Sequence, residues 1–290
     1  MGSLELGLVI AVAAAAATLG ENRFASDSGG TARSADGVPI RFQVTGKTEP
    51  TVVLVHGWAL DHRVWDGQAA RLAERHRVVT LDLAGHGESG RQRSAWTMAA
   101  FGEDVKAVVE AVGAKQVVLV GHSMGGPVVL EAARRMPARV KGIVLVDTLQ
   151  DVEKRTPPDA IEAMTRQLQG DYKAVITQFT TEYLFAPATP AAVRERVLGH
   201  ATGMAPGISI AILRDAWGYD PVPALREIKA KVRAVNADKY PTNLEVNRRY
   251  MPGFDAALIP GSGHYPMLED PARFNPALEQ AIGQVLAAPR

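Results

Sequence analysis

A serine lies in a glycine-rich segment with the spacing of a nucleophile turn. Residues 121–126 are Gly-His-Ser-Met-Gly-Gly, which places Ser123 at the centre of a G-x-S-x-G pattern. An apolar run, Gln116–Val120, precedes this segment, and a helical stretch, Gly126–Met136, follows it. A serine at such a strand-to-helix turn is lifted above the sheet, near free amides and the positive end of a helix. The pattern and its context therefore predict that Ser123 is a nucleophile.

A serine hydroxyl is a weak nucleophile at neutral pH, so a base must lie within hydrogen-bond reach. His264 is the candidate, because its loop joins the last predicted strand to the last predicted helix, at the sheet edge where Ser123 also lies. Two aspartates that follow predicted strands, Asp238 and Asp147, could orient the imidazole. The usual order places the acid on the strand just before the strand of the histidine. This order favours Asp238, with Asp147 as the alternative.

The oxyanion of an acyl-transfer reaction needs amide donors near the nucleophile. We expect one donor to be the amide of Met124 and the other to be the amide of Trp58, in the segment His-Gly-Trp at 56–58. His56 itself is interpreted as a buried, hydrogen-bonded structural residue. The segment 82–89, Asp-Leu-Ala-Gly-His-Gly-Glu-Ser, contains an acid and a histidine but lacks the converging ligands of a metal site. It predicts a glycine-led turn.

Short β-branched runs alternate with amphipathic stretches from about Gly37 onward, which is typical of a sheet covered by helices on both faces. Continuous apolar runs predict buried parallel strands at Thr51–Val55, Val78–Leu81, Gln116–Val120, Gly142–Val146, Val232–Val235 and Ala256–Ile259. The alternating run Val38–Val44 predicts an antiparallel edge strand. Helices are expected at Trp65–His76, Met98–Val112 and Gly126–Met136, with a last helix opened by Asp270-Pro271.

Residues 149–220 interrupt this alternation with helical segments, prolines and aromatic side chains. We predict a helical cap there, inserted into an α/β core formed by residues 36–148 and 221–290. The aromatic residues of the cap, with Trp58 and Met124, indicate an apolar acyl or alcohol pocket, although they could equally be the cap's own core.

Residues 1–35 are interpreted as a leader or possible signal remnant followed by a linker. Leu6–Val12 and the alanines at 13–17 resemble the apolar region of a secretory signal and are short for a membrane span. No Lys or Arg precedes Arg23, so an ordinary N-terminal helix is the alternative. The compartment stays open: secreted or periplasmic if residues 1–25 are a signal peptide, and cytoplasmic otherwise. The polar segment Ser26–Gly30 is interpreted as a linker.

The composition of the chain limits the classes of partner that we expect it to bind. The 290 residues carry 32 Lys and Arg against 31 Asp and Glu, which gives no broad basic surface for nucleic acid. The absence of cysteine excludes disulfides, thiolate metal sites and a cysteine nucleophile. We therefore expect a small-molecule, ester-like substrate, no nucleic acid and no stable membrane span, with the oligomeric state open.

The motifs around His56, Asp82, Ser123 and His264 resemble, in this order, those of the α/β-hydrolase superfamily, in its esterase, lactonase and haloperoxidase-like branch. The resemblance covers residues 36 to 290 except the cap. It implies a mostly parallel eight-stranded sheet, a lid over the site, and no metal or organic cofactor. Many relatives have a Gly-x-x-Asp turn before the acid, whereas this chain has the shorter Asn-Ala-Asp238.

These residues predict a serine hydrolase that cleaves a small to medium apolar carboxylic ester through an acyl-enzyme. A lactonase or a carbon–carbon bond hydrolase would use the same residues. A ligand-binding receptor with low turnover is the alternative from another class, and loss of one of the three reactive residues would be its typical sign.

Overall fold

The computed structural model describes residues 28–287, and within this range eight strands form one sheet in the order β1-β2-β4-β3-β5-β6-β7-β8. The strands are β1 (Ser28–Arg33), β2 (Pro39–Thr45), β3 (Thr51–Val55), β4 (Val78–Leu81), β5 (Val117–His122), β6 (Val140–Val146), β7 (Lys231–Ala237) and β8 (Ala256–Ile259). β2 is antiparallel to both β1 and β4, and the other neighbouring strands are parallel. The predicted α/β-hydrolase fold, with a mostly parallel eight-stranded sheet, is confirmed.

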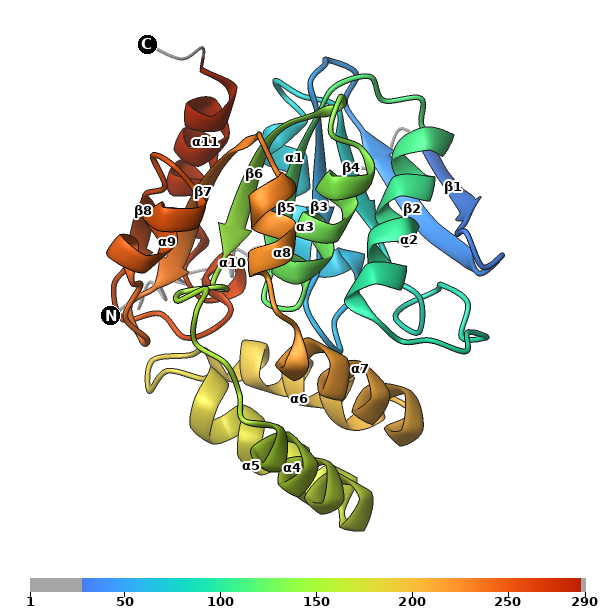
Figure 1. Ribbon diagram of the computed structural model, residues 1–290, viewed down its shortest axis with the longest axis vertical. Coiled ribbons are helices and arrows are strands. Elements are labelled where there is room, and N and C mark those ends of the chain that lie inside the picture. Colours follow the sequence, from blue (N-terminus) through green and yellow to red (C-terminus); the bar gives the residue numbers. More distant parts are fainter. Residues whose placement is uncertain (1–27, 288–290) are drawn as a thin grey trace, which may run out of the picture.

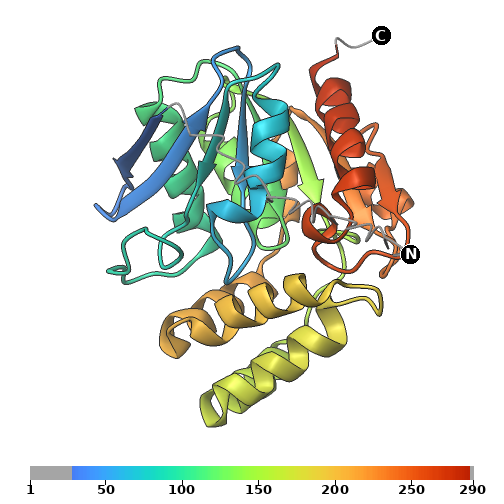
Figure 2. The ribbon, with the colours of Figure 1, turned by 180° about the vertical axis from the view of Figure 1, so that it is seen from behind.

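Helices cover both faces of this sheet. One face carries α2 (Met98–Ala111), α3 (Gly125–Arg135) and α8 (Val222–Glu227), and the opposite face carries α1 (Asp66–Leu72) and α11 (Pro271–Leu286) (Figures 1 and 2). The short helices η1 (His62–Trp65), α9 (Leu244–Tyr250) and α10 (Pro266–Glu269) complete the connections. Asp270 caps α11 by accepting a hydrogen bond from the Arg273 amide, as the Asp-Pro pair predicted.

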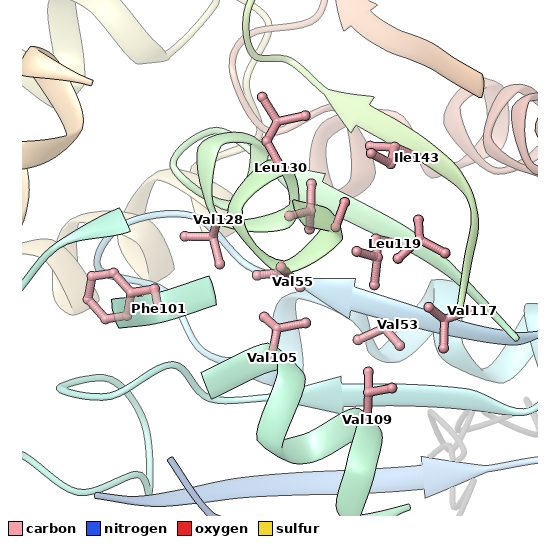
Figure 3. Packing of buried hydrophobic residues seen from close by; sticks show 14 of the residues in the cluster. Val53, Val55, Phe101, Val105, Val109, Val117, Leu119, Val128, Leu130 and Ile143 are labelled. Atoms are coloured by element: carbon pink, nitrogen blue, oxygen red, sulfur yellow. The ribbon is translucent and has the colours of Figure 1, made fainter. Parts of the chain in front are cut away.

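Two apolar layers hold the sheet between its helices. Val53 and Val55 of β3 point to the same face as Val117 and Leu119 of β5, and they meet Phe101, Val105 and Val109 of α2 and Val128 of α3 (Figure 3). The alternate residues Val52, Leu54, Val118 and Val120 pack toward Trp65, Phe274 and Ile282 on the other face. Because both faces are buried, the central strands are continuously apolar. This packing on both faces holds the strands in place, so that the carboxyl ends of the parallel strands lie along one edge of the sheet.

A helical segment follows β6 and lies beyond the carboxyl edge of the sheet. It contains α4 (Pro158–Gly170), α5 (Tyr172–Phe179), the π-helical turn η2 (Thr180–Leu184), α6 (Ala191–Gly203) and α7 (Pro206–Gly218), here called the inserted helices. The arrowhead of β6 points toward them in Figure 1. They fall within residues 149–220, where the sequence predicted a helical insertion.

The structure corrects two sequence predictions near the start of the described residues. Ser28–Arg33 is strand β1, paired with β2 from Ser28 opposite Val44 to Arg33 opposite Pro39, so the predicted linker is wrong for residues 28–30. β2 consequently lies inside the sheet, and the predicted edge position of Val38–Val44 is also wrong. Four of the six β1 residues are exposed and only Ala32 is buried, so its sequence lacks the apolar signal of a core strand. The possible signal peptide at residues 1–25 lies outside the described residues.

Candidate active site

Ser123 directly follows β5 in a backbone conformation that residues other than glycine rarely adopt. Its φ is 53°, and its amide donates a 3.0 Å hydrogen bond to the carbonyl of Val146 at the end of β6. α3 begins two residues later at Gly125. A non-glycine residue in the left-handed region carries strain that the surrounding structure must sustain. The serine is thus held between the ends of two neighbouring strands and the start of a helix.

Three glycines make this turn sterically possible. A Cβ at Gly121 would lie 2.2 Å from the carbonyl oxygen of Gly125, which is backbone of the turn itself. At Gly125 it would lie 2.7 Å from the carbonyl oxygen of Val55, and at Gly126 it would lie 2.5 Å from Cγ2 of Thr148. Real Cβ atoms essentially never approach so closely. The two glycines of the G-x-S-x-G pattern and the glycine that follows it therefore reflect three separate close approaches, to the turn, to β3 and to the loop after β6.

A chain of hydrogen bonds runs from Ser123 through His264 to Asp147. The hydroxyl of Ser123 lies 2.8 Å from Nε2 of His264, and Nδ1 of His264 lies 2.6 Å from Oδ2 of Asp147. The side chain of Asp147 is 4% exposed and that of His264 is 16% exposed. With Nδ1–H donated to the carboxylate, Nε2 is free to accept the serine proton. This arrangement has the geometry of a nucleophile, a base and an orienting acid.

The prediction that Asp238 would be the carboxylate beside His264 is wrong in this geometry. Asp238 is exposed, and its Oδ1 accepts a 2.8 Å hydrogen bond from the Gly261 amide. The sheet register gives the reason: Val146 pairs with His122, so Asp147 emerges level with Ser123 on the neighbouring strand. Asp238 lies one strand further away and beyond the end of β7.

The amides expected to bind an oxyanion lie in the segments next to Ser123. A Cβ at Gly57 would lie 3.0 Å from Cβ of Ser123, which places the segment before Trp58 directly against Ser123. Within residues 28–287, the amides of Trp58 and Met124 donate no hydrogen bond to the protein. The indole Nε1 of Trp58 donates to Oγ of Ser209 in α7, at 3.1 Å. Both amides are therefore free to serve a ligand.

His56 is fully buried and hydrogen-bonded, which confirms its predicted structural role. Its Nδ1–H donates to the carbonyl of Gly57 at 2.7 Å, and its Nε2 accepts from the amide of Leu83 at 3.0 Å. Burial lowers its pKa, and the nearby Asp82 only partly opposes this effect. His56 thus joins the loop after β3 to the loop after β4 as a neutral imidazole.

Asp82 organises the turn after β4, as the glycine-led pattern predicted. Its carboxylate accepts hydrogen bonds from the amides of His62 and Glu88, both at 2.8 Å, and from Nδ1 of His62 at 2.9 Å. Gly87, at φ 47°, has no room for a Cβ, which would lie 2.2 Å from Oδ2 of Asp82. Burial alone would raise the pKa of Asp82, but the His62 hydrogen bond and the other donors lower it to about 2.

Two residues that were not predicted from the sequence hold the loop of His264. Nε2–H of His122 donates to the carbonyl of His264 at 2.7 Å, and the carboxylate of Glu269 accepts from the amides of Gly263 and Tyr265 at 2.8 and 3.0 Å. The available signal for Glu269 was an acidic residue in the first turn of a proline-led helix, a pattern that often reaches back to free amides. His122 carried no such signal, because its partner is 142 residues away in the chain.

A cavity of about 920 Å³ separates the inserted helices from the loops after β6 and β7. Its aromatic wall consists of Phe179, Tyr183, Trp217, Tyr219 and Tyr240. Leu184, which also lines it, accepts the amide hydrogen of His264 through its carbonyl at 2.8 Å, and Leu149 lies two residues beyond Asp147. The cavity therefore adjoins the backbone that carries His264 and Asp147. Its volume is in the range of small-molecule sites.

Between Ser28 and Ala287, no group of three or more His, Asp or Glu side chains is placed to hold a metal ion. In the same part of the chain, no helix has the length and apolar character to span a membrane.

Comparison with known proteins places the chain in a family. Residues 52–277 match the model of the alpha/beta hydrolase family. The chain is 25% identical to a 2-(acetamidomethylene)succinate hydrolase of Mesorhizobium japonicum, over 74% of this chain and 82% of that protein. It is also 25% identical to a pimeloyl-[acyl-carrier protein] methyl ester esterase of Nitrosospira multiformis, over 78% and 91%.

A solved structure of a thermophilic esterase from Thermogutta terrifontis has the same architecture. It superposes with a TM-score of 0.77 at 25% identity, over 90% of this chain and all of that one. The family match, these relatives and this structure agree with one another. The chain belongs to the alpha/beta hydrolase family and is a hydrolase.

Proposed function

We propose that the protein is a serine hydrolase that cleaves a carboxylic ester through an acyl-enzyme intermediate, with Ser123, His264 and Asp147 as its catalytic residues. The observation that carries the proposal is the hydrogen-bonded chain from the Ser123 hydroxyl through His264 to the buried Asp147. Asp147 fixes the tautomer of His264, so that Nε2 faces the serine as a base.

The reaction follows from this arrangement. Nε2 of His264 accepts the Ser123 proton while Oγ attacks the ester carbonyl, and the free amides of Trp58 and Met124 hold the resulting oxyanion. The imidazolium then protonates the departing alkoxide, which leaves as the alcohol. Water, deprotonated by the same imidazole, attacks the acyl-enzyme, and the acid is released with Ser123 restored. Asp147 stabilises the imidazolium in both steps without itself taking the proton.

The cavity lined by the inserted helices supports an apolar substrate of small to medium size. Its walls are largely aromatic and aliphatic, and burial of apolar substrate surface against them supplies binding energy of about 25 cal/mol per Å². The inserted helices act in this proposal as the cap of the site. The names of two relatives, a methyl ester esterase and a succinate-derivative hydrolase, are in keeping with an acyl substrate.

Pre-steady-state hydrolysis of a chromogenic short-acyl ester tests the proposal. We expect a burst of alcohol release with an amplitude close to the enzyme concentration, and no burst or turnover in Ser123→Ala. A fluorophosphonate probe should label the native chain and leave Ser123→Ala unlabelled. Undiminished hydrolysis by Ser123→Ala would refute the proposed nucleophile. A panel of lactones and activated carbon–carbon substrates of matched size tests whether esters are the preferred class.

A further inference from the structure

The backbone of His264 is held at every polar group by a different part of the molecule. The amides of Gly263 and Tyr265, on either side of it, both donate to the carboxylate of Glu269. Its own amide donates to the carbonyl of Leu184 in η2. Its carbonyl accepts from Nε2–H of His122, the residue that immediately precedes the nucleophile. A loop residue with its peptide groups bound on both sides has little freedom to rotate.

The side chain of His122 is placed to make this hydrogen bond with the carbonyl of His264. It is fully buried, and within residues 28–287 its Nδ1 has no hydrogen-bond partner. A Cβ on Gly57 would lie 2.8 Å from this Nδ1, so the ring fills the space between the segment before Trp58 and the loop of His264. Burial, and then the neighbouring His264, holds the pKa of His122 well below its usual range. The imidazole is thus neutral, with its single proton on Nε2 directed at the carbonyl of His264.

Glu269 holds the same loop from α10 and joins it to the inserted helices. Besides the two loop amides, its Oε2 accepts a 2.7 Å hydrogen bond from the hydroxyl of Thr189, just before α6. Gly263 is required at this point, since a Cβ there would lie 2.8 Å from Oε1 of Glu269 and 2.6 Å from the amide nitrogen of Ala186. A partly buried carboxylate with several N–H and O–H donors is a strong anchor.

We propose that His122 and Glu269 are positioning residues. By holding the carbonyl of His264 and the two amides on either side of it, they fix the imidazole of His264 between Ser123 and Asp147. This inference rests on the proposed function, because it assigns His264 the role of base. Neither residue needs to touch the substrate. Loss of either contact lets the loop shift, and misplacement of a catalytic group by about 1 Å can cost about 100-fold in rate.

A matched pair of substitutions separates the hydrogen bond of His122 from its volume. The amide nitrogen of glutamine reproduces the position of Nε2, whereas that of asparagine reproduces Nδ1 and falls short of the His264 carbonyl. We expect His122→Gln to keep kcat within about 3-fold of the native value, and His122→Asn to lose about 10- to 100-fold in kcat with KM nearly unchanged. Equal losses in both variants, or full activity in His122→Asn, would overturn the role of the hydrogen bond.

Glu269→Gln tests the other half of the proposal. The glutamine keeps one acceptor oxygen but turns an N–H₂ donor toward one of the two loop amides, and we expect kcat to fall about 10-fold. Glu279→Gln is the control, since Glu279 pairs with Arg71 on the exposed side of α11 and should show native activity. Equal activity of the Glu269 and Glu279 variants would contradict the proposal.

The low-field NMR resonance of the His264 Nδ1 proton provides a readout that needs no substrate. We expect this resonance, from the 2.6 Å contact with Asp147, to persist in His122→Gln and to broaden or shift upfield in His122→Asn and Glu269→Gln. Near-UV circular dichroism establishes that each variant is folded. If the native protein cleaves no ester, the proposed function fails while the resonance still decides the positioning role. An unchanged resonance in His122→Asn and Glu269→Gln would refute that role even in an active esterase.

Discussion

The loops that follow β6 and β7 both begin with an aspartate, but the two aspartates have different surroundings. Each contains an aspartate within two residues of the end of a parallel strand, at the same edge of the sheet. Asp147 is buried, has a φ of 44°, and accepts hydrogen bonds from His264, Gln150 and the amide of Ala237. Asp238 is exposed and accepts from the Gly261 amide. Residue type and position after a strand do not distinguish the two roles, whereas position in the sheet order does.

The two loops nevertheless meet at one cavity. Leu149 and Gln150 continue from Asp147 into its wall, and Tyr240 and Pro241 continue from Asp238 into the wall beside them. In the proposed function, the β6 loop supplies the acid and part of the wall, and the β7 loop supplies wall alone. Substitutions in each loop can therefore test whether catalysis and binding are divided between the loops in this way.

Asp147→Asn should have the largest effect. The asparagine can present its N–H₂ group to Nδ1 of His264 and favour the tautomer with the proton on Nε2, so that the base can no longer accept the serine proton. We expect kcat/KM for a short ester to fall about a thousand- to ten-thousand-fold, with the fold retained. Steady-state kinetics with circular dichroism checks this, and turnover within tenfold of native would remove Asp147 from the proposed triad.

A third strand-end aspartate, Asp82, should affect stability according to pH. Its pKa is lowered from 3.8 to about 2, so its contribution of about 2 kcal/mol is complete above pH 3.8 and is lost as the pH falls toward 2. His62 stays protonated below pH 5, because the hydrogen bond and charge of Asp82 outweigh burial and raise its pKa above 6.5. Urea unfolding should therefore show Asp82→Asn less stable than the native chain at pH 5, with the gap narrowing by pH 2.5. A pH-independent gap would contradict this account.

Tyr240→Ala should separate binding from chemistry in the β7 loop. Tyr240 lines the cavity, and its hydroxyl donates to the carbonyl of Tyr183. Truncation removes apolar wall, so we expect KM for a bulky aromatic ester to rise about 3- to 10-fold while kcat for an acetate ester stays native. Leu258→Ala on exposed β8 is the control and should alter neither constant. A matching loss of kcat for the acetate ester would assign the loop a part in the chemistry.

Asp238→Asn should have the smallest effect. The asparagine oxygen can still accept from the Gly261 amide, so we expect activity within about twofold of native and a stability change below about 1 kcal/mol. Steady-state assays and thermal unfolding measure both quantities. A hundredfold loss of activity would restore Asp238 as the acid and reverse the comparison.

The sequence predicted most of the sheet, and it predicted Ser123 and His264 of the hydrogen-bonded chain, from local patterns and from the order of the motifs along the chain. Continuous apolar runs locate the central strands, and the glycine pattern around Ser123 lies within one short segment of the sequence, although two of its three close approaches are to Val55 and Thr148 elsewhere in the chain. Asp147 was the alternative and not the first choice, because the deciding fact is the pairing of Val146 with His122, a register that local pattern does not encode. Strand β1 was missed because its residues are mostly exposed. The contacts of His122 and Glu269 were not predicted, because they depend on the path that the loop of His264 takes in the folded chain.

The three glycines around Ser123 also indicate which positions can be varied if the protein is changed by directed evolution. A mutant library should return almost no functional clones at Gly121, Gly125 or Gly126, because any side chain there must displace backbone or Thr148 and shift the serine. Diversity belongs instead in the cavity-lining residues of the inserted helices and at Tyr240 and Pro241, where the cavity wall can change while Thr242 keeps its hydrogen bond with Asn236 at the end of β7. The same backbone crowding that holds one serine in place leaves the choice of substrate open to selection.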